Sequence, residues 1–167
     1  MIANSFPPVI GAEPCILVLG SMPGKASLQA QQYYAHPRNL FWPFIQTILG
    51  VDMACGYKER CEALIRSGVA VWDVLQSCER PSSLDADIIE SSIVPNDFAT
   101  LLSQNPGIQK ILFNGAKAHK AFMKYVATDI AHLLEDIQLI PLPSTSPANA
   151  SIRREVKLAA WRDALCD

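Results

Sequence analysis

Four short runs of apolar residues divide the chain, and each predicts a β-strand. The runs cover residues 15–20, 69–72, 110–113 and 137–142. A continuous apolar run of this length is typical of a strand that is buried on both faces of a sheet. Residues suited to turns follow closely, with Gly20 ending the first run and Asp73 following the second. We therefore predict four buried strands.

Apolar residues at helical spacing lie between these runs. Residues 39–49, 57–67, 116–126 and 151–165 show this pattern, and residues 96–103 follow an Asn-Asp pair suited to capping a helix. Asn39 is expected at the N-cap or first turn of its helix, and Gly50 is expected to end that helix. Residues 21–38 show no period and predict irregular structure. Residues 77–95 predict a loop with one short helical piece.

Strands that alternate with helices predict an α/β fold. The expected architecture is a three-layer α/β/α domain around a central four-stranded parallel sheet, with right-handed crossovers. The length of 167 residues fits a single domain spanning residues 1–167. In such sheets the segments that leave the carboxyl ends of the strands meet at one edge, where ligands bind. That edge should hold residues 20–24, Asp73, residues 114–115 and residues 143–149.

Composition narrows the class of protein and its compartment. Half of the residues are hydrophobic and 18% are charged, as in ordinary globular domains. No stretch approaches the ~20 apolar residues of a membrane span, so we expect no membrane contact. The five cysteines form no CxxC pair, and their odd number favours reduced thiols in the cytoplasm. With only three histidines present, we expect no metal.

The charge is unevenly distributed although the net charge is only −2. Residues 52–97 carry nine acidic and four basic side chains, whereas residues 110–124 carry four basic side chains and no acidic one. Residues 153–162 add four basic side chains against Glu155. Charge alone favours ordinary solvated helix faces, and a phosphate-binding surface is the alternative.

The first loop of the expected edge, Gly-Ser-Met-Pro-Gly at residues 20–24, contains two glycines that allow close approach of backbone N–H groups to a ligand. The loop lacks the Lys-Ser/Thr pair of a P-loop and the third glycine of a dinucleotide fingerprint. Binding of nucleoside triphosphates or NAD is therefore disfavoured. A plain tight turn explains the loop equally well.

Residues 33–42, with the sequence YYAHPRNLFW, bring aromatic rings, a cation, an imidazole and an amide together. Phe41 and Trp42 suit packing against the core. A tyrosine in the preceding loop could stack on a nucleobase, and Arg38 could contact a phosphate. His36 is a candidate general acid, although a hydrogen-bonded loop histidine is the commoner case.

Four motifs in this order, GSMPG, YYAHPRNLFW, LFNG and LPSTSPANA, resemble the uracil-DNA glycosylase superfamily and, within it, the branch of hypoxanthine-DNA glycosylases. The resemblance spans residues 15–160. It implies a monomeric, cofactor-free base-excision enzyme whose partner is double-stranded DNA containing a deaminated base, chiefly hypoxanthine. The uracil-excising branches carry Asn where this chain has Met22, and His or Asn where it has Leu142, which argues against efficient uracil excision.

The resemblance also implies site residues. Asn39 would position the attacking water by accepting a hydrogen bond from it, and Asn114 would stabilise the departing base together with backbone N–H groups of the first loop. The other residues that would contact the base are Gly20, Ser21, Met22, Pro23, Tyr34, whose ring would stack on it, and Phe41. The residues that would contact DNA are Gly24, Lys25, Arg38, Ser144, Thr145, Ser146, Pro147 and Asn149.

Three other functions remain open at this point. The chain could be a uracil or mismatch-type DNA glycosylase, or an N-glycosidase of free nucleosides. It could also bind lesions without turnover, because Met22 and Leu142 replace polar side chains of the relatives. Asp73, Arg80, Ser83 and Asp85 lie at or near the expected edge, and the sequence assigns them no role beyond capping or structure.

Overall fold

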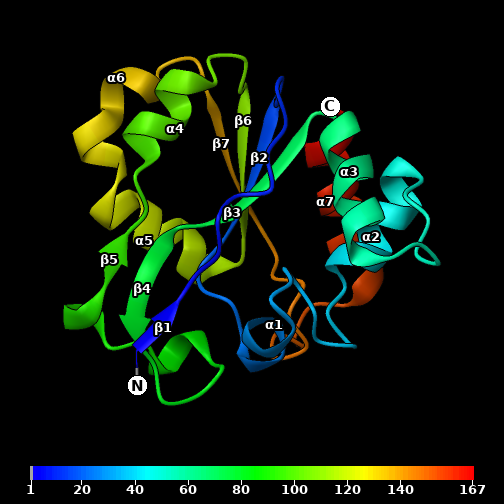
Figure 1. Cartoon of the computed structure of the whole chain (residues 1–167), viewed down its shortest axis with the longest axis horizontal. Helices are drawn as coiled ribbons and strands as arrows, with labels where there is room; N and C mark the ends of the chain where they lie inside the picture. The colour runs from blue at the N-terminus through cyan, green and yellow to red at the C-terminus, as the bar shows by residue number, and fades with distance from the viewer. Residues whose placement is uncertain (1) are drawn as a thin grey trace.

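The structure, a computed structural model that describes residues 2–167, is built around a four-stranded parallel sheet (Figure 1). Its strands are β2 (Ile16–Gly20), β3 (Val69–Asp73), β6 (Lys110–Asn114) and β7 (Gln138–Leu142). They are arranged in the order β3-β2-β6-β7, and every neighbouring pair is parallel. The four predicted strands and the α/β class are therefore confirmed.

Helices cover both faces of this sheet, as the three-layer prediction requires (Figure 1). On one face lie α4 (Phe98–Gln104), α5 (Ala116–Tyr125) and α6 (Ala131–Leu134), with the 3-10 turn η3 (Ala127–Ile130) before α6. On the other face lie α2 (Phe41–Leu49), α3 (Tyr57–Arg66) and α7 (Arg154–Cys166).

Side-chain alternation along β2 explains the two cores. Leu17 and Leu19 belong to the core that contains Phe122 of α5, whereas Ile16 and Val18 belong to the core that contains residues of α2 and α7. Successive residues of a strand point to opposite faces, so a strand covered on both sides must be apolar throughout. This requirement produces the continuous apolar runs of the sequence.

Two parts of the fold differ from the prediction. The segment expected to be irregular contains the short helix α1 (Lys25–Ala30). A second, antiparallel sheet is formed by β1 (Ile2–Asn4), β4 (Leu75–Glu79) and β5 (Val94–Pro95) in the order β1-β4-β5. The loop predicted for residues 77–95 was therefore wrong in part, although two 3-10 turns, η1 (Asp85–Asp87) and η2 (Glu90–Ser92), do lie in it.

The helix ends agree with the sequence at two positions and differ at one. Asp97 caps α4 by accepting a hydrogen bond from the Thr100 N–H, and Gly50 ends α2 with a left-handed backbone. Leu40, and not Asn39, occupies the N-cap position of α2. Asn39 precedes it and accepts a hydrogen bond from the Phe41 N–H through Oδ1 at 2.9 Å. This contact fixes the Asn39 amide at the start of the helix.

The parallel strands end at one edge of the sheet, where Gly20 pairs with Asp73 and Asn114 pairs with Leu142 in register. The loops that follow these residues all leave the sheet in the same direction. Within residues 2–167, no helix is long and apolar enough to cross a membrane.

Candidate active site

A cavity of about 980 Å³ opens at this edge of the sheet. It is lined by the first loop, by residues of the Tyr33–Asn39 segment, by Asp73, and by the loops after β4, β6 and β7. Nearly all of the predicted site residues line it: Gly20, Ser21, Met22, Pro23, Gly24, Lys25, Tyr34, Arg38, Asn39, Asn114, Ser144, Thr145, Ser146, Pro147 and Asn149. Phe41 is fully buried behind the wall.

Asn39 and Asn114 are joined by Thr145. The Asn114 Nδ2 donates to Thr145 Oγ1 at 2.9 Å, and the same hydroxyl donates to Asn39 Oδ1 at 2.8 Å. The Thr145 N–H also donates to Asn114 Oδ1 at 2.9 Å. Thr145 is 1% exposed, so its side chain lies beneath the cavity wall and not on the surface where a phosphate contact was expected. Its position in the structure is that of a bridge between the two amides.

These contacts fix which end of each amide faces the ligand. Asn39 Oδ1 accepts from both the Phe41 N–H and the Thr145 hydroxyl, which uses its two lone pairs. Asn114 Oδ1 accepts from the Thr145 N–H, and one N–H of its amide is used by the Thr145 hydroxyl. The groups that remain are both N–H donors of Asn39, and one N–H donor and one oxygen lone pair of Asn114. The expectation that Asn39 would accept a hydrogen bond from water through Oδ1 does not fit this arrangement.

The backbone between β6 and α5 holds Asn114 in place. Gly115 has φ +99, a conformation that L side chains rarely adopt, and its N–H donates to the Leu142 carbonyl at 3.0 Å. A Cβ on Gly115 would lie 3.1 Å from the Cβ of Ser144. Glycine therefore allows the loop after β7 to approach the end of β6 and brings Thr145 within reach of Asn114.

Tyr34 lines the cavity, and its ring packs against a second aromatic ring. Its ring stacks on Phe41 with centroids 4.2 Å apart, so Phe41 supports Tyr34 from behind. The backbone of Tyr34 has φ +55, which is uncommon for a residue with a side chain. Burial, and next the nearby carboxyl of Asp73, raise the pKa of the Tyr34 hydroxyl. The other ring face is the candidate surface for a base.

The first loop is tied to the loop after β4. Arg80, which is 4% exposed, donates from Nη2 to the Pro23 carbonyl, and the Lys25 N–H donates to Ser83 Oγ at 2.8 Å. Ser21 Oγ donates to Asp85 Oδ1 at 2.5 Å. Arg80, Ser83 and Asp85, to which the sequence assigned no role, therefore hold the loop that lines the cavity.

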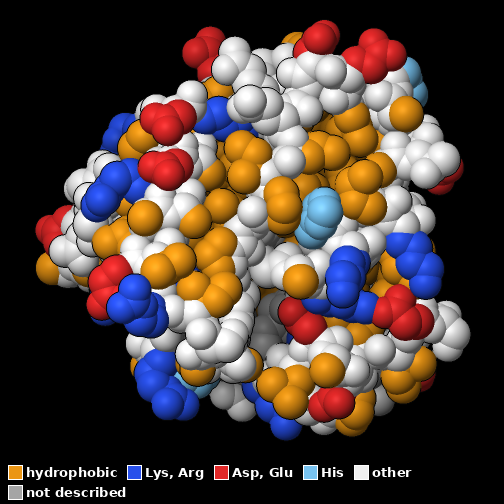
Figure 2. Space-filling view, turned by 180° about the vertical axis from the view of Figure 1, so that it is seen from behind, with side chains coloured by type: hydrophobic (Ala, Val, Ile, Leu, Met, Phe, Trp, Pro, Cys, Tyr) orange, Lys and Arg blue, Asp and Glu red, His pale blue; other side chains and the backbone are white. Residues whose placement is uncertain are grey.

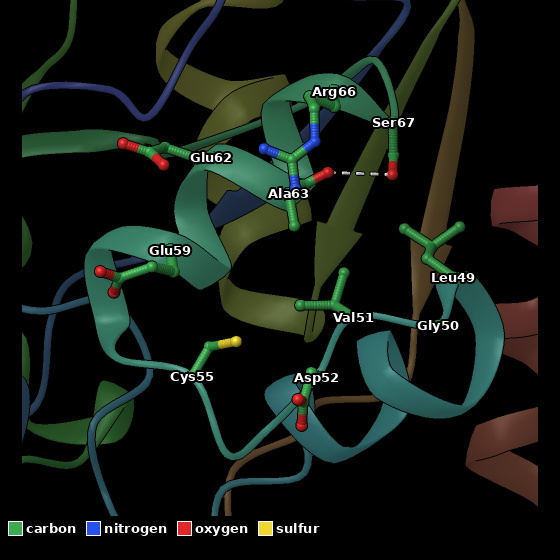
Figure 3. Close-up of a pocket in the computed structure, with 10 residues that line it drawn as sticks. All are labelled: Leu49, Gly50, Val51, Asp52, Cys55, Glu59, Glu62, Ala63, Arg66 and Ser67. Atoms are coloured by element: carbon green, nitrogen blue, oxygen red, sulfur yellow. Dashed lines mark hydrogen bonds between the residues drawn. The ribbon is translucent and has the colours of Figure 1, made fainter.

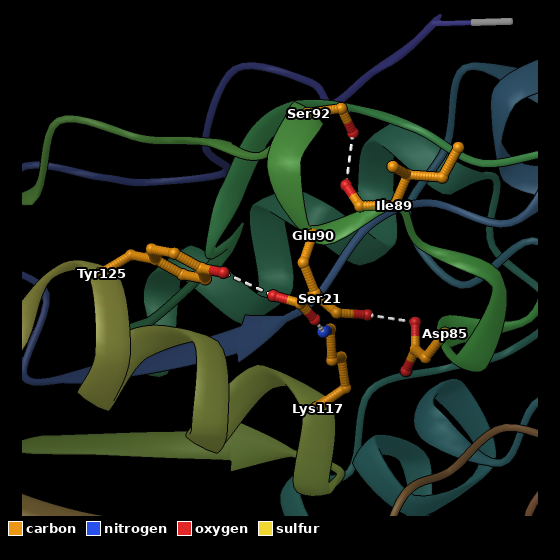
Figure 4. A network of polar contacts seen from close by, with 7 residues as sticks. All are labelled: Ser21, Asp85, Ile89, Glu90, Ser92, Lys117 and Tyr125. Atoms are coloured by element: carbon orange, nitrogen blue, oxygen red, sulfur yellow. Dashed lines mark hydrogen bonds and ion pairs between the residues drawn. The ribbon is translucent and has the colours of Figure 1, made fainter.

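A second set of polar contacts, around Glu90, lies beside the contact between Ser21 and Asp85 (Figure 4). Lys117, which lines the cavity, pairs with Glu90, and the Tyr125 hydroxyl donates to the same carboxylate. Both contacts lower the pKa of Glu90. Because Glu90 neutralises Lys117 at the cavity mouth, the basic face of α5 is partly compensated there.

Asp73 is the acidic residue of the cavity wall. It is 3% exposed, and its Oδ2 has no hydrogen-bond partner. Burial, together with the charge of Asp85, raises the pKa of Asp73 to about 7, and Arg80 acts in the opposite direction. The sequence places this acid directly after a buried strand, but it gives no sign of the burial that changes its chemistry.

A smaller cavity of about 580 Å³ lies between the end of α2 and α3 (Figure 3). Three acidic side chains and Arg66 line it, and the four motifs GSMPG, YYAHPRNLFW, LFNG and LPSTSPANA lie elsewhere. Among residues 2–167 no group of three or more His, Cys, Asp or Glu side chains could hold a metal ion. The larger cavity holds both asparagines and nearly all of the other predicted site residues, so we assign the candidate active site there.

Charge around the site is mixed. Seen from behind, the molecule is hollowed in its lower half, and Lys or Arg side chains lie on both sides of the hollow (Figure 2). Lys25 and Arg38 line the cavity and form no ion pair among residues 2–167, whereas Lys117, which also lines it, is paired with Glu90. A polyanion could therefore be held at the rim, while the uncharged donors of the two amides face inward.

The fold and this set of residues define a member of a base-excision family. The family model for the uracil DNA glycosylase superfamily matches residues 7–165, and the chain belongs to this superfamily. It is a DNA glycosylase.

Its relatives include proteins named for a particular base. The chain is 40% identical over 116 residues to the hypoxanthine DNA glycosylase of Methanosarcina barkeri. The aligned region covers 69% of this chain and 72% of the relative. It is 35% identical over 119 residues to the hypoxanthine DNA glycosylase of Methanosarcina acetivorans, and this aligned region covers 71% of this chain and 74% of the relative. The solution NMR structure of a candidate uracil DNA glycosylase from Methanosarcina acetivorans superposes with a TM-score of 0.82 at 30% identity, covering 99% of this chain and 97% of that one.

Proposed function

We propose that this DNA glycosylase hydrolyses the N-glycosidic bond of hypoxanthine in double-stranded DNA and leaves an abasic site. The observation that carries the proposal is the hydrogen-bonded set Asn39, Thr145 and Asn114, which presents N–H donors to a cavity of about 980 Å³. Similarity to two hypoxanthine DNA glycosylases supports the choice of base.

The reaction requires the nucleotide to leave the duplex stack and enter the cavity, at a cost of a few kcal/mol. Tyr34, supported from behind by Phe41, offers a ring face on which the base can stack. Such stacking contributes about 1–3 kcal/mol per base. The rim residues Lys25, Arg38 and Ser146 are our candidates for contacts with the DNA backbone.

Cleavage of the bond leaves negative charge on the base and positive charge on the sugar. The free N–H of Asn114 is suited to stabilise the base as charge develops on its oxygen and nitrogen acceptors. Asn39 Nδ2 can hold the attacking water by donating to its oxygen. Since a neutral amide is no general base at neutral pH, positioning and stabilisation of the leaving base must supply the rate enhancement.

The test is release of hypoxanthine or uracil from end-labelled duplexes with EDTA present, scored by alkaline cleavage at the abasic site. We expect release of hypoxanthine by the wild type and a loss of about 10²–10³-fold in Asn39→Ala and in Asn114→Ala. Gln46→Ala, which removes an exposed amide from α2, is the matched control. Normal turnover in both active-site variants would contradict the assigned roles.

The same assay separates the other functions. Release from free deoxyinosine that does not depend on salt would indicate a nucleoside hydrolase, because duplex binding through several phosphates weakens steeply with salt. Tight binding of lesion DNA with no release would indicate a binding module. Release of uracil in preference to hypoxanthine would place the chain with the uracil-excising enzymes.

We further propose that the enzyme acts as a monomer in the cytoplasm. The five cysteines, Cys15, Cys55, Cys61, Cys78 and Cys166, are all free thiols, which supports a reducing compartment. Light scattering of the purified protein with and without duplex would test the monomeric state.

A further inference from the structure

Asp73 is a buried acid in the wall of the active site, and the mechanism above does not use it. The side chain lines the cavity at the end of β3, where it is 3% exposed. Its Oδ2 has no hydrogen-bond partner, and it forms no ion pair among residues 2–167. A buried polar atom without a partner costs about 1–3 kcal/mol, so such an atom in a cavity wall calls for an explanation, and a partner supplied by a ligand is one.

A second buried oxygen, the Tyr34 hydroxyl, lies in the same wall. It has no hydrogen-bond partner of good geometry, and the nearby Asn114 amide acts against burial by lowering its pKa. A Cβ placed on Gly20 would lie 2.6 Å from Asp73 Oδ1 and 3.2 Å from Tyr34 Oη, so both oxygens converge beside the first loop. The absence of a side chain at Gly20 keeps this space open for a ligand.

We propose that Asp73, in its protonated form, recognises the carbonyl oxygen that deamination creates on the base by donating a hydrogen bond to it. This inference rests on the proposed function and adds a base-contacting residue to it. Deamination replaces an exocyclic amino group, which donates, by a carbonyl oxygen, which accepts. A protonated carboxyl can donate to that oxygen, whereas an ionised carboxylate only accepts and would repel it.

The surroundings of Asp73 favour the protonated form. The acidic neighbour Asp85, on η1, lines the same cavity and acts on Asp73 through its charge, and Tyr33 and Tyr34 interact with Asp73 from the loop after α1. Arg80 is the one basic group that acts on it, and Arg80 is directed to the Pro23 carbonyl. Burial and the Asp85 charge raise the pKa of Asp73 to about 7, which keeps a substantial protonated fraction near neutral pH.

The proposal predicts the pH dependence of excision. The protonated form is active, so the single-turnover rate should be constant well below about pH 7 and fall about tenfold per pH unit well above it. Asp73→Asn keeps a donor in the same place without a titrating group. We expect this variant to stay within about threefold of the wild type at about pH 6 and to lose the decline at higher pH.

Two further variants sharpen the test. Asp73→Ala removes the donor and should slow hypoxanthine release about 10²–10³-fold at about pH 6. Asp85→Asn removes the charge that raises the pKa of Asp73, so the midpoint of the wild-type decline should move to lower pH. His36 also lines the cavity, but it is present in every variant, so its contribution cancels in the comparison.

The experiment is single-turnover release of hypoxanthine from a duplex between about pH 5.5 and about pH 9, with folding of each variant checked by thermal melting. A decline in Asp73→Asn equal to that of the wild type would overturn the inference. If Asp73→Ala fails to fold, the Asp73→Asn profile alone decides. If the wild type releases no hypoxanthine at any pH, the proposed function fails, whereas normal release with an unchanged variant profile overturns only the role of Asp73.

Discussion

Replacement of Thr145 by valine tests the central contact of the site. Valine has nearly the shape of threonine, so it fills the same space under the cavity wall and removes only the hydroxyl. That hydroxyl accepts from Asn114 Nδ2 at 2.9 Å and donates to Asn39 Oδ1 at 2.8 Å. The backbone contacts of residue 145, with the Leu40 N–H and with Asn114 Oδ1, remain possible in the variant.

The structure indicates the size of the effect. Asn114 is 8% exposed, so its amide loses a partner where water has little access, at a cost of about 1–3 kcal/mol. Asn39 Oδ1 keeps the Phe41 N–H and loses less. Without the hydroxyl, both amides gain freedom to rotate, and we expect base release to slow about 10–100-fold, less than removal of either asparagine.

Urea unfolding and single-turnover release together measure both effects. Thr145→Ser, which retains the hydroxyl and loses a methyl group, is the matched control and should keep most of the activity. If Thr145→Val released hypoxanthine at the wild-type rate with an unchanged unfolding midpoint, the hydroxyl would not be what orients the two amides. If Thr145→Ser were as impaired as Thr145→Val, loss of packing would explain both variants.

Two predictions concern stability. Gly115→Ala should lower the free energy of unfolding by about 1–3 kcal/mol and also slow base release, because φ +99 is strained for alanine. The control is Gly107→Ala, where no positive φ is required, and it should change little in the same urea titrations. Asp73→Asn should stabilise the protein by up to roughly 4 kcal/mol at about pH 8 and by little at about pH 4. The reason is that folding raises the pKa of Asp73 from 3.8 to about 7, so the wild type loses stability as the pH rises between these two values. Equal urea midpoints for the wild type and Asp73→Asn at about pH 8 would contradict this, with exposed Asp129→Asn as the control for loss of one acid.

The central sheet was predictable because a strand that is buried on both faces must be apolar at nearly every position. The smaller sheet was not predictable for the opposite reason. Along β4 only Leu75 and Cys78 are buried, and the strand pairs with residues 2–4, far away in the chain. A short strand with two buried side chains has no period that distinguishes it from a loop. The helix α1, with six residues and one buried side chain, Ser27, gives an equally weak pattern.

The membership of the site was more predictable than its geometry. The ends of parallel strands meet at one edge, so Gly20 and Asn114 could be placed there from the sequence. The orientation of the amides could not, because it depends on contacts of Thr145 with Asn114 and Asn39, which are separated from it by 31 and 106 residues. Thr145 resembles any loop threonine in the sequence, and its burial appears only when the loop after β7 packs beside α2.

The buried polar residues of this chain show what the edge of the sheet is built for. They are Ser21, Ser27, Asp73, Arg80, Asn114, Thr145 and Lys157. Burial of a polar side chain is unfavourable unless hydrogen bonds compensate it. Arg80 and Lys157 donate to backbone carbonyls, Asn114 donates to Thr145, and Ser27 accepts from the Ala35 N–H. Such contacts cannot reorganise cheaply when charge develops on a ligand, which is the property that stabilisation of a departing base requires. Asp73 makes none of these contacts, and the hydrogen bond that we propose between Asp73 and the base would supply one.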